Sequence, residues 1–206
     1  MRSMRTVTKV CFFLVMLMSV SACRQQLKTD AYINYVKGND NGLKRSIEVD
    51  GWQYSFQYKP YDYIVLMESR GDLKSFDVKK RLAELKGTAW FNISFKRTDG
   101  TVTPLKFNVS TLDEYNERLD YYLNEAAKDI KLAYGADTLL PVSYLFENNY
   151  NLTPQETMIV GFYLPKTDDH PQRDMQLSYN DHMFKNGIIK ATYSKAVLNN
   201  IPNLVY

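Results

Sequence analysis

Residues that carry thiol and metal chemistry are scarce in this sequence. Its 206 residues include two cysteines, Cys11 and Cys23, and two histidines, His170 and His182. Both cysteines lie near the amino terminus, so the rest of the chain can form no disulfide and offers no thiol nucleophile. The histidine count excludes a histidine-rich zinc site within one chain. We therefore expect neither a metal nor a cofactor.

Motifs of the common enzyme classes are also missing. The chain contains no Gly-x-Ser-x-Gly, no Ser-x-x-Lys, no His-Glu-x-x-His and no glycine loop that would cradle a phosphate. Carboxylate pairs of the kind used in glycoside hydrolysis meet only in three dimensions, so the sequence leaves them open. These absences favour a protein without enzymatic activity.

No apolar run is long enough for a permanent membrane span. The longest covers residues 10–20 and reads VCFFLVMLMSV. As a helix it would extend about 16 Å, half the hydrocarbon thickness of a bilayer. It is preceded by three basic residues and no acidic one, namely Arg2, Arg5 and Lys9. A basic segment, a short apolar core and small residues after it are typical of a secretory signal peptide.

The end of this signal reads Val20-Ser21-Ala22-Cys23. It resembles the lipobox of bacterial lipoproteins, in which a branched apolar residue and two small residues precede an invariant cysteine. The resemblance implies that Cys23 receives a diacylglycerol thioether, that cleavage follows Ala22, and that the new amino terminus is acylated with a fatty acid such as palmitate. Several acyl chains would anchor the protein stably without a spanning helix. An ordinary cleaved signal and a retained anchor are the alternatives.

Excess charge of one sign is absent after the signal. The first 22 residues hold three of the 26 basic residues and none of the 23 acidic ones, so the chain from Cys23 onward has equal numbers of both. A nucleic-acid partner would need a basic excess, so none is expected. Arg24 stands where lipoproteins retained in the inner membrane have aspartate, and no acidic run follows. The resemblance therefore points to the outer membrane and its periplasmic face.

Aromatic residues, in contrast, are abundant, with 16 tyrosines, 10 phenylalanines and two tryptophans. They favour a sheet-rich fold, because aromatic side chains suit a pleated, half-buried surface. The pattern predicts an α+β fold, a mostly antiparallel sheet or sandwich with about eight strands, one long helix and two or three short helices. We divide the chain into a signal peptide (1–22), a lipidated polar tether (23–30) and a single domain (31–206).

Alternating apolar and polar residues predict two β-hairpins. The first covers 43–58 and turns at Asp50-Gly51, and the second covers 89–109 and turns at Asp99-Gly100. Residues 158–164 are apolar on both faces, which indicates a central strand. Other strands are predicted near 144–148, 175–179 and 189–193.

The longest helix is predicted from Thr111 to about Ala133. Thr111 and Glu114 match a capping box, and apolar residues recur after them at spacings of three and four. Shorter helices are predicted over 60–69, over 77–86 and after Ser194, although the apolar run within 60–69 leaves a strand open there.

A tyrosine-rich segment is the main binding candidate. Tyr58, Tyr61 and Tyr63 could stack on sugar rings or contact a partner protein, or they could close the core where a strand meets a helix. The stretches Asp168-Asp169-His170 and Asp181-His182 could hold a cation or move a proton, although the first looks like a solvated loop.

Taken together, these features predict a membrane-anchored envelope lipoprotein with a non-enzymatic binding or scaffolding role. Its partner would be another envelope protein or a glycan. The alternative is a hydrolase of unrecognised type that acts on envelope glycans or peptides. That alternative requires a cleft with convergent carboxylates, or a histidine that faces one.

Overall fold

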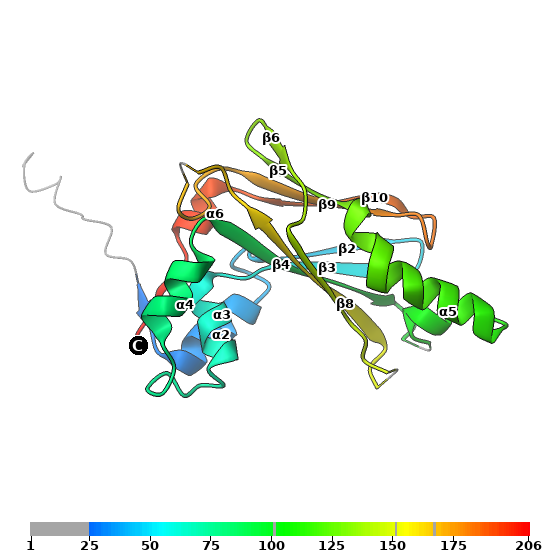
Figure 1. Cartoon of the computed structure of the whole chain (residues 1–206), viewed down its shortest axis with the longest axis horizontal. Coiled ribbons are helices and arrows are strands. Elements are labelled where there is room, and N and C mark those ends of the chain that lie inside the picture. The colour runs from blue at the N-terminus through cyan, green and yellow to red at the C-terminus, as the bar shows by residue number, and fades with distance from the viewer. Residues whose placement is uncertain (1–24, 101, 151, 167) are drawn as a thin grey trace, which may run out of the picture.

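The computed structural model describes residues 25–206 except 101, 151 and 167, so the signal peptide and Cys23 lie outside the described residues. Within them the fold is α+β, with eleven strands in three sheets and five α-helices (Figure 1). The two larger sheets are antiparallel, as predicted, but the strands outnumber the eight expected. In the described part of the chain, no helix is both long and apolar enough to cross a membrane.

The larger sheet has five strands in the order β2-β3-β4-β8-β7. The hairpin predicted around Asp50-Gly51 is confirmed, because both turn residues have positive φ (47° and 75°), as a type I′ turn requires. The strand predicted from Met158 is interior, between β4 and β7. The strands are β2 (Lys44–Val49), β3 (Trp52–Tyr58), β4 (Thr88–Arg97), β7 (Ser143–Glu147) and β8 (Gln155–Tyr163).

The second predicted hairpin is wrong in its second strand. β4 pairs with β3 on one edge and with β8 on the other, so no edge is free for the segment that follows it. That segment forms a short 3-10 turn, η1 (Pro104–Lys106). Pro104 has no backbone N–H to contribute to a ladder, which further disfavours a strand.

The predicted long helix is also wrong beyond Asp129. The helical run consists of α5 (Leu112–Asp120), a π-helical turn η2 (Tyr121–Glu125) and a 3-10 turn η3 (Ala126–Asp129). The capping box of Thr111 and Glu114 is confirmed at its start. The chain then becomes strand β5 (Ile130–Tyr134), whose alternate residues are buried. Burying alternate side chains of this segment as a sheet strand stabilises the fold more than burying one face of a longer helix would.

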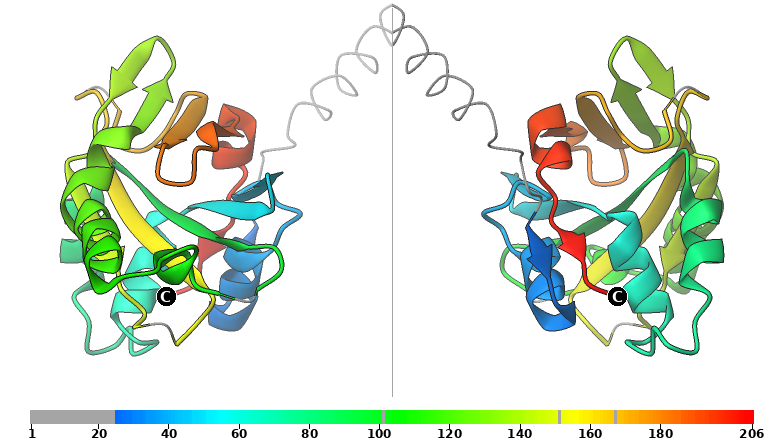
Figure 2. Two further views of the ribbon diagram at one scale, coloured as in Figure 1. Left: turned by 90° about the vertical axis from the view of Figure 1, so that its right-hand side faces the viewer. Right: turned by 90° about the vertical axis from the view of Figure 1, so that its left-hand side faces the viewer.

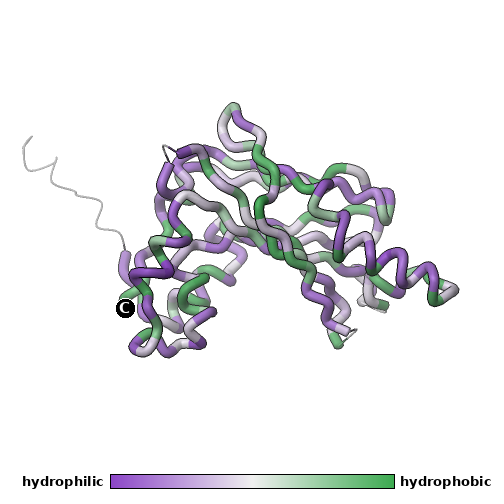
Figure 3. Tube along the Cα trace, viewed as in Figure 1, coloured by the Kyte–Doolittle hydropathy of each residue, from purple (hydrophilic) through white to green (hydrophobic). Residues whose placement is uncertain are grey.

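The smaller antiparallel sheet has four strands in the order β10-β9-β5-β6. It packs against the five-stranded sheet through aromatic rings. Tyr193 lies 5.5 Å from Phe91 and Tyr179 lies 6.5 Å from Phe95, measured between ring centroids. Figure 3 shows apolar and polar residues mixed along the strands, as expected when one face of each sheet is buried. The remaining strands here are β6 (Asp137–Leu139), β9 (Met175–Asp181) and β10 (Gly187–Tyr193).

The first and last described segments of the chain meet at one side of the fold. β1 (Gln26–Leu27) pairs in parallel with β11 (Asn203–Leu204), and Figure 2 shows them side by side. Within the stretch predicted as a tether, 23–30, the structure has β1 from Gln26 and a helix that begins at Thr29. The parallel pair orders these residues through the backbone contacts of Asn203 with Gln25 and of Val205 with Leu27.

Short helices gather at the same side (Figure 1). The alternative of a strand in the segment after Pro60 is excluded, because it forms α3. Asp77 caps α4 and Ser194 caps α6, each accepting a hydrogen bond from a backbone N–H three residues on. The helices here are α2 (Thr29–Lys37), α3 (Tyr61–Glu68), α4 (Val78–Leu85) and α6 (Lys195–Asn199).

Gly161 in β8 allows a close approach of the Trp90 ring on the outer face of the larger sheet. A Cβ atom at this position would lie 2.9 Å from the ring, which is held by a hydrogen bond from its Nε1 to Thr88 Oγ1. We expect Gly161→Ala to lower the free energy of unfolding by about 1–3 kcal/mol in urea titrations, because the ring must move. Ser143→Ala, at the cross-strand partner, is the control and should cost below about 0.5 kcal/mol.

Candidate ligand pocket

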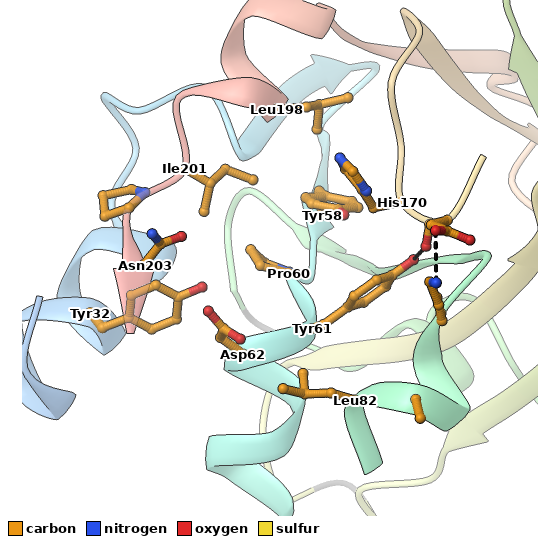
Figure 4. A pocket seen from close by; sticks show the side chains of 14 residues that line it. Tyr32, Tyr58, Pro60, Tyr61, Asp62, Leu82, His170, Leu198, Ile201 and Asn203 are labelled. Atoms are coloured by element: carbon orange, nitrogen blue, oxygen red, sulfur yellow. Dashed lines mark hydrogen bonds and ion pairs between the residues drawn. The ribbon is translucent and has the colours of Figure 1, made fainter. Parts of the chain in front are cut away.

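A pocket of about 540 Å³ lies beside the paired strands β1 and β11, and we call it the terminal pocket (Figure 4). Its wall is built from α2, the junction of β3 and α3, α4, the loop before β9 and the C-terminal segment. Its volume is within the range of roughly 300–1,000 Å³ that is usual for small-molecule sites. The lining residues used below are Tyr32, Tyr58, Tyr61, Asp62, His170 and Asn203.

The structure separates the three tyrosines that the sequence groups together. Tyr58 and Tyr61 line the terminal pocket, whereas Tyr63 lies in the core. Tyr58 is itself nearly covered, at 4% exposed. The hydroxyl of Tyr61 donates to the carbonyl of Thr88 (2.6 Å) and accepts from its N–H (3.1 Å), so this half-buried ring has a fixed position. The three rings therefore form no continuous exposed patch.

Tyr32 contributes a hydroxyl that lacks a partner among the described residues. The side chain is fully buried, and the hydroxyl makes no hydrogen bond there. Burial, and next the nearby carboxylate of Asp62, raise the pKa of Tyr32 far above its ordinary value. The hydroxyl therefore remains protonated and can donate to an acceptor on a ligand.

Asp62, in the first turn of α3, faces the C-terminal segment. Its carboxylate accepts a hydrogen bond from the Tyr206 hydroxyl (2.6 Å) and one from the backbone N–H of Leu204 (3.4 Å). In Figure 4 it lies beside Tyr32 and Asn203. A carboxylate, an amide and a free hydroxyl thus meet at this end of the pocket.

The Asp168-Asp169-His170 stretch does not form a convergent cluster. Asp168 accepts from Tyr134 (2.6 Å) and pairs with Arg173 (3.1 Å), whereas Asp169 pairs with Lys86 (2.7 Å). The exposed His170 lines the terminal pocket, beside Tyr58 and Leu198 and away from Asp62 in Figure 4. The sequence predicted that this stretch need not converge, and the side chains do point to different partners.

The side chains of Asp181 and His182 also point to different partners. Asp181 is fully buried and accepts hydrogen bonds from Tyr54, from Asn186 and from the backbone of Phe184. His182 is exposed and lies 3.3 Å from Asp129. The described residues contain no group of three or more histidine, cysteine or acidic side chains that could hold a metal ion.

The sequence also offers Tyr32 and Tyr35 as binding candidates, and of these Tyr32 lines the pocket, but sequence reasoning missed the C-terminal wall. Tyr32 lies on α2, within the stretch assigned partly to the tether, and Asn203 lies on a two-residue strand. The pairing of β1 with β11 brings these two residues together although most of the chain separates them in sequence. No local sequence pattern predicts such a contact. A comparison with protein-family models, with curated proteins and with solved structures finds no match to this chain.

Proposed function

We propose that the protein is a non-enzymatic envelope lipoprotein that binds a glycan in its terminal pocket. The observation that carries this proposal is the combination of tyrosine rings with hydrogen-bonding groups in one pocket, including the Tyr32 hydroxyl, which has no partner among the residues that the structure describes. Sugar rings offer apolar faces to aromatic rings and hydroxyls to polar groups. The half-buried ring of Tyr61 can supply the first contact, and Tyr32, Asp62 and Asn203 the second.

The proposed anchor would hold this pocket close to the membrane. Gln26 is the first residue of β1, and Cys23 lies three positions before it. Three residues span at most about 10 Å, so acyl chains on Cys23 would place the paired termini near the lipid surface. We infer attachment to the periplasmic face of the outer membrane, where peptidoglycan is within reach.

Peptidoglycan fragments released by a muramidase are the probe for the pocket. We expect them to bind the full-length protein in calorimetry, and Tyr32→Phe to weaken binding at least tenfold, because it keeps the ring and removes a donor that has no partner among the described residues. Tyr163→Phe is the matched control, since this hydroxyl is on a ring that is 66% exposed and outside the pocket. No binding at millimolar concentration, or equal binding by both variants, would refute a glycan site here.

Cys23→Ser tests the anchor. Cells fed labelled palmitate are expected to label the wild-type protein and not the variant, and the variant should leave the membrane fraction. Equal labelling of both proteins would remove the anchor and with it the proposed location. The glycan test is independent of this result.

One observation favours the hydrolase alternative: His170 lines a pocket that is also lined by Asp62 and Asp169. Asp169, however, is engaged by Lys86, and Asp62 by the C-terminal segment. We therefore expect the peptidoglycan fragments to be recovered intact after incubation. Cleavage that His170→Ala abolishes would establish the hydrolase instead.

A further inference from the structure

A second, smaller cleft of about 280 Å³ lies on the other side of α3. It is bounded by α3, by Arg81 of α4 and by the outer face of the five-stranded sheet. Tyr61 and Asp62 of α3 face the terminal pocket, whereas Ile64 and Met67 line this cleft. The two sites are therefore distinct, and we call this one the Lys59 cleft.

The walls of the Lys59 cleft are largely apolar and firmly held. The Trp90 ring lies against Gly161 and is fixed by its hydrogen bond to Thr88. Ile64 belongs to a small buried cluster behind it, with Val65 and Leu85. Ile159 of β8 completes the floor. Such a surface suits the apolar part of a ligand, because it buries that part without having to rearrange.

The amine of Lys59 is the one charge of the cleft that no ion pair offsets within the described residues. Lys59 is half-buried, and its amine has neither a salt bridge nor a hydrogen bond there. Burial lowers the pKa of Lys59, although the carboxylates of Glu147 and Glu68 act in the opposite direction.

The other two charged side chains of the cleft pair with each other, and Arg81 also pairs with Glu84 at 3.1 Å. The guanidinium of Arg81 binds both carboxylate oxygens of Glu68, at 2.7 and 2.8 Å. Of the three charged side chains that line the cleft, Lys59 is therefore the one without an ion pair in the described part of the chain, and it lies against an aromatic and aliphatic wall. An unpaired ammonium in such surroundings costs free energy that an anionic partner would recover.

We propose that the Lys59 cleft binds a small amphiphilic monocarboxylate, with its carboxylate on the Lys59 amine and its apolar tail against Trp90 and Ile159. One ammonium without an ion pair among the described residues calls for a single negative charge. The volume lies just below the usual range of roughly 300–1,000 Å³ and so suits a ligand smaller than most drug-sized molecules. This inference does not depend on the glycan pocket or on the anchor.

Three isosteric probes separate the contribution of charge from that of the apolar tail. We would titrate the full-length protein calorimetrically with 4-phenylbutyrate, 4-phenylbutanol and 4-phenylbutylamine in one detergent, with blanks subtracted. The carboxylate is expected to bind at least tenfold more tightly than the alcohol, and the amine not at all. Equal binding of the carboxylate and the alcohol would overturn the proposal.

Lys59→Met removes the charge while keeping the length of the side chain. It is expected to bring phenylbutyrate down to the affinity of the alcohol, while Lys59→Arg retains the preference for the anion. Lys44→Met, on edge strand β2 and outside the cleft, is the matched control and should bind as the wild type does. Lys59→Met should not melt earlier than the wild type, because it removes a half-buried charge that has no ion pair among the described residues. Undiminished phenylbutyrate binding by Lys59→Met would refute the site.

Discussion

Replacing Asp181 with alanine is expected to lower the free energy of unfolding by about 4 kcal/mol, the largest effect foreseen for any single side chain here. Its carboxylate is fully buried and accepts hydrogen bonds from the Tyr54 hydroxyl, from the Asn186 amide (3.0 Å) and from the Phe184 N–H (3.2 Å). Each donor left unsatisfied in the interior costs roughly 1–3 kcal/mol. Chemical denaturation of the purified protein measures the loss.

These hydrogen bonds join segments that are far apart in the sequence and lie in different sheets. Tyr54 lies on β3 of the larger sheet, and Asp181 ends β9 of the smaller one, 127 residues later. Phe184 and Asn186 belong to the loop from β9 to β10, and the Phe184 ring stacks on Trp52 at 3.8 Å. We therefore expect the Asp181→Ala variant to lose the fixed packing of this loop together with global stability.

Two further variants distinguish this network from a general effect of charge. Asp181→Asn keeps one acceptor oxygen and the shape of the side chain, so its loss should be smaller than that of alanine. Asp137→Ala removes an exposed carboxylate that pairs with Arg173 at 3.2 Å, and should cost below about 1 kcal/mol. Comparable losses in Asp181→Ala and Asp137→Ala would show that the buried hydrogen bonds contribute little.

Elements whose determinants lie within a few residues of one another could be predicted from the sequence. The turn at Asp50-Gly51, the capping box at Thr111 and the cap at Ser194 each depend on neighbouring residues. Their energetics require no distant partner. The alternating strands β3 and β9 were equally visible, because one buried face imposes a period of two.

Elements decided by distant partners could not be predicted in this way. Residues 130–134 continue the apolar spacing of α5, yet they form β5 because β9 offers them a strand edge. Residues 104–109 alternate like a strand, yet β8 already occupies the edge of β4. In both cases the outcome depends on a strand, β9 or β8, that lies more than 40 residues further along the chain. A local sequence pattern carries no information about such a distant strand.

The sequence could predict only part of the candidate site, because the positions of its tyrosines depend on whether their segment is a helix or a strand. Tyr61 and Tyr63 alternate in a way that suits one face of a strand, but the segment folds as α3. Residues two apart on a helix point to nearly opposite sides. Tyr61 consequently faces the terminal pocket while Tyr63 enters the core. Assigning this segment to a helix is therefore sufficient to predict that the two rings point to different sides.

Glu156 in β8 is expected to make the protein less stable as the pH rises from about 5 to about 8. The side chain is fully buried on the sheet face that carries Phe95 as cross-strand partner, and neither oxygen has a hydrogen bond in the described part of the chain. Burial raises the pKa of Glu156 from 4.5 to about 7, and the backbone N–H of Asn149 opposes this more weakly. The folded chain thus keeps a proton that the unfolded chain releases near pH 4.5.

Because the folded state binds more protons between these two pKa values, unfolding becomes easier as the pH increases through them. The full effect is on the order of 3 kcal/mol, reached above the folded-state pKa. Glu156→Gln should abolish this dependence, so its stability relative to the wild type should grow steadily from pH 4.5 to pH 8 in urea titrations. Glu147→Gln, an exposed residue of the neighbouring strand β7, is the control and should follow the wild-type curve. If Glu156→Gln also follows that curve, the Glu156 carboxylate is solvated and its pKa is not raised by burial.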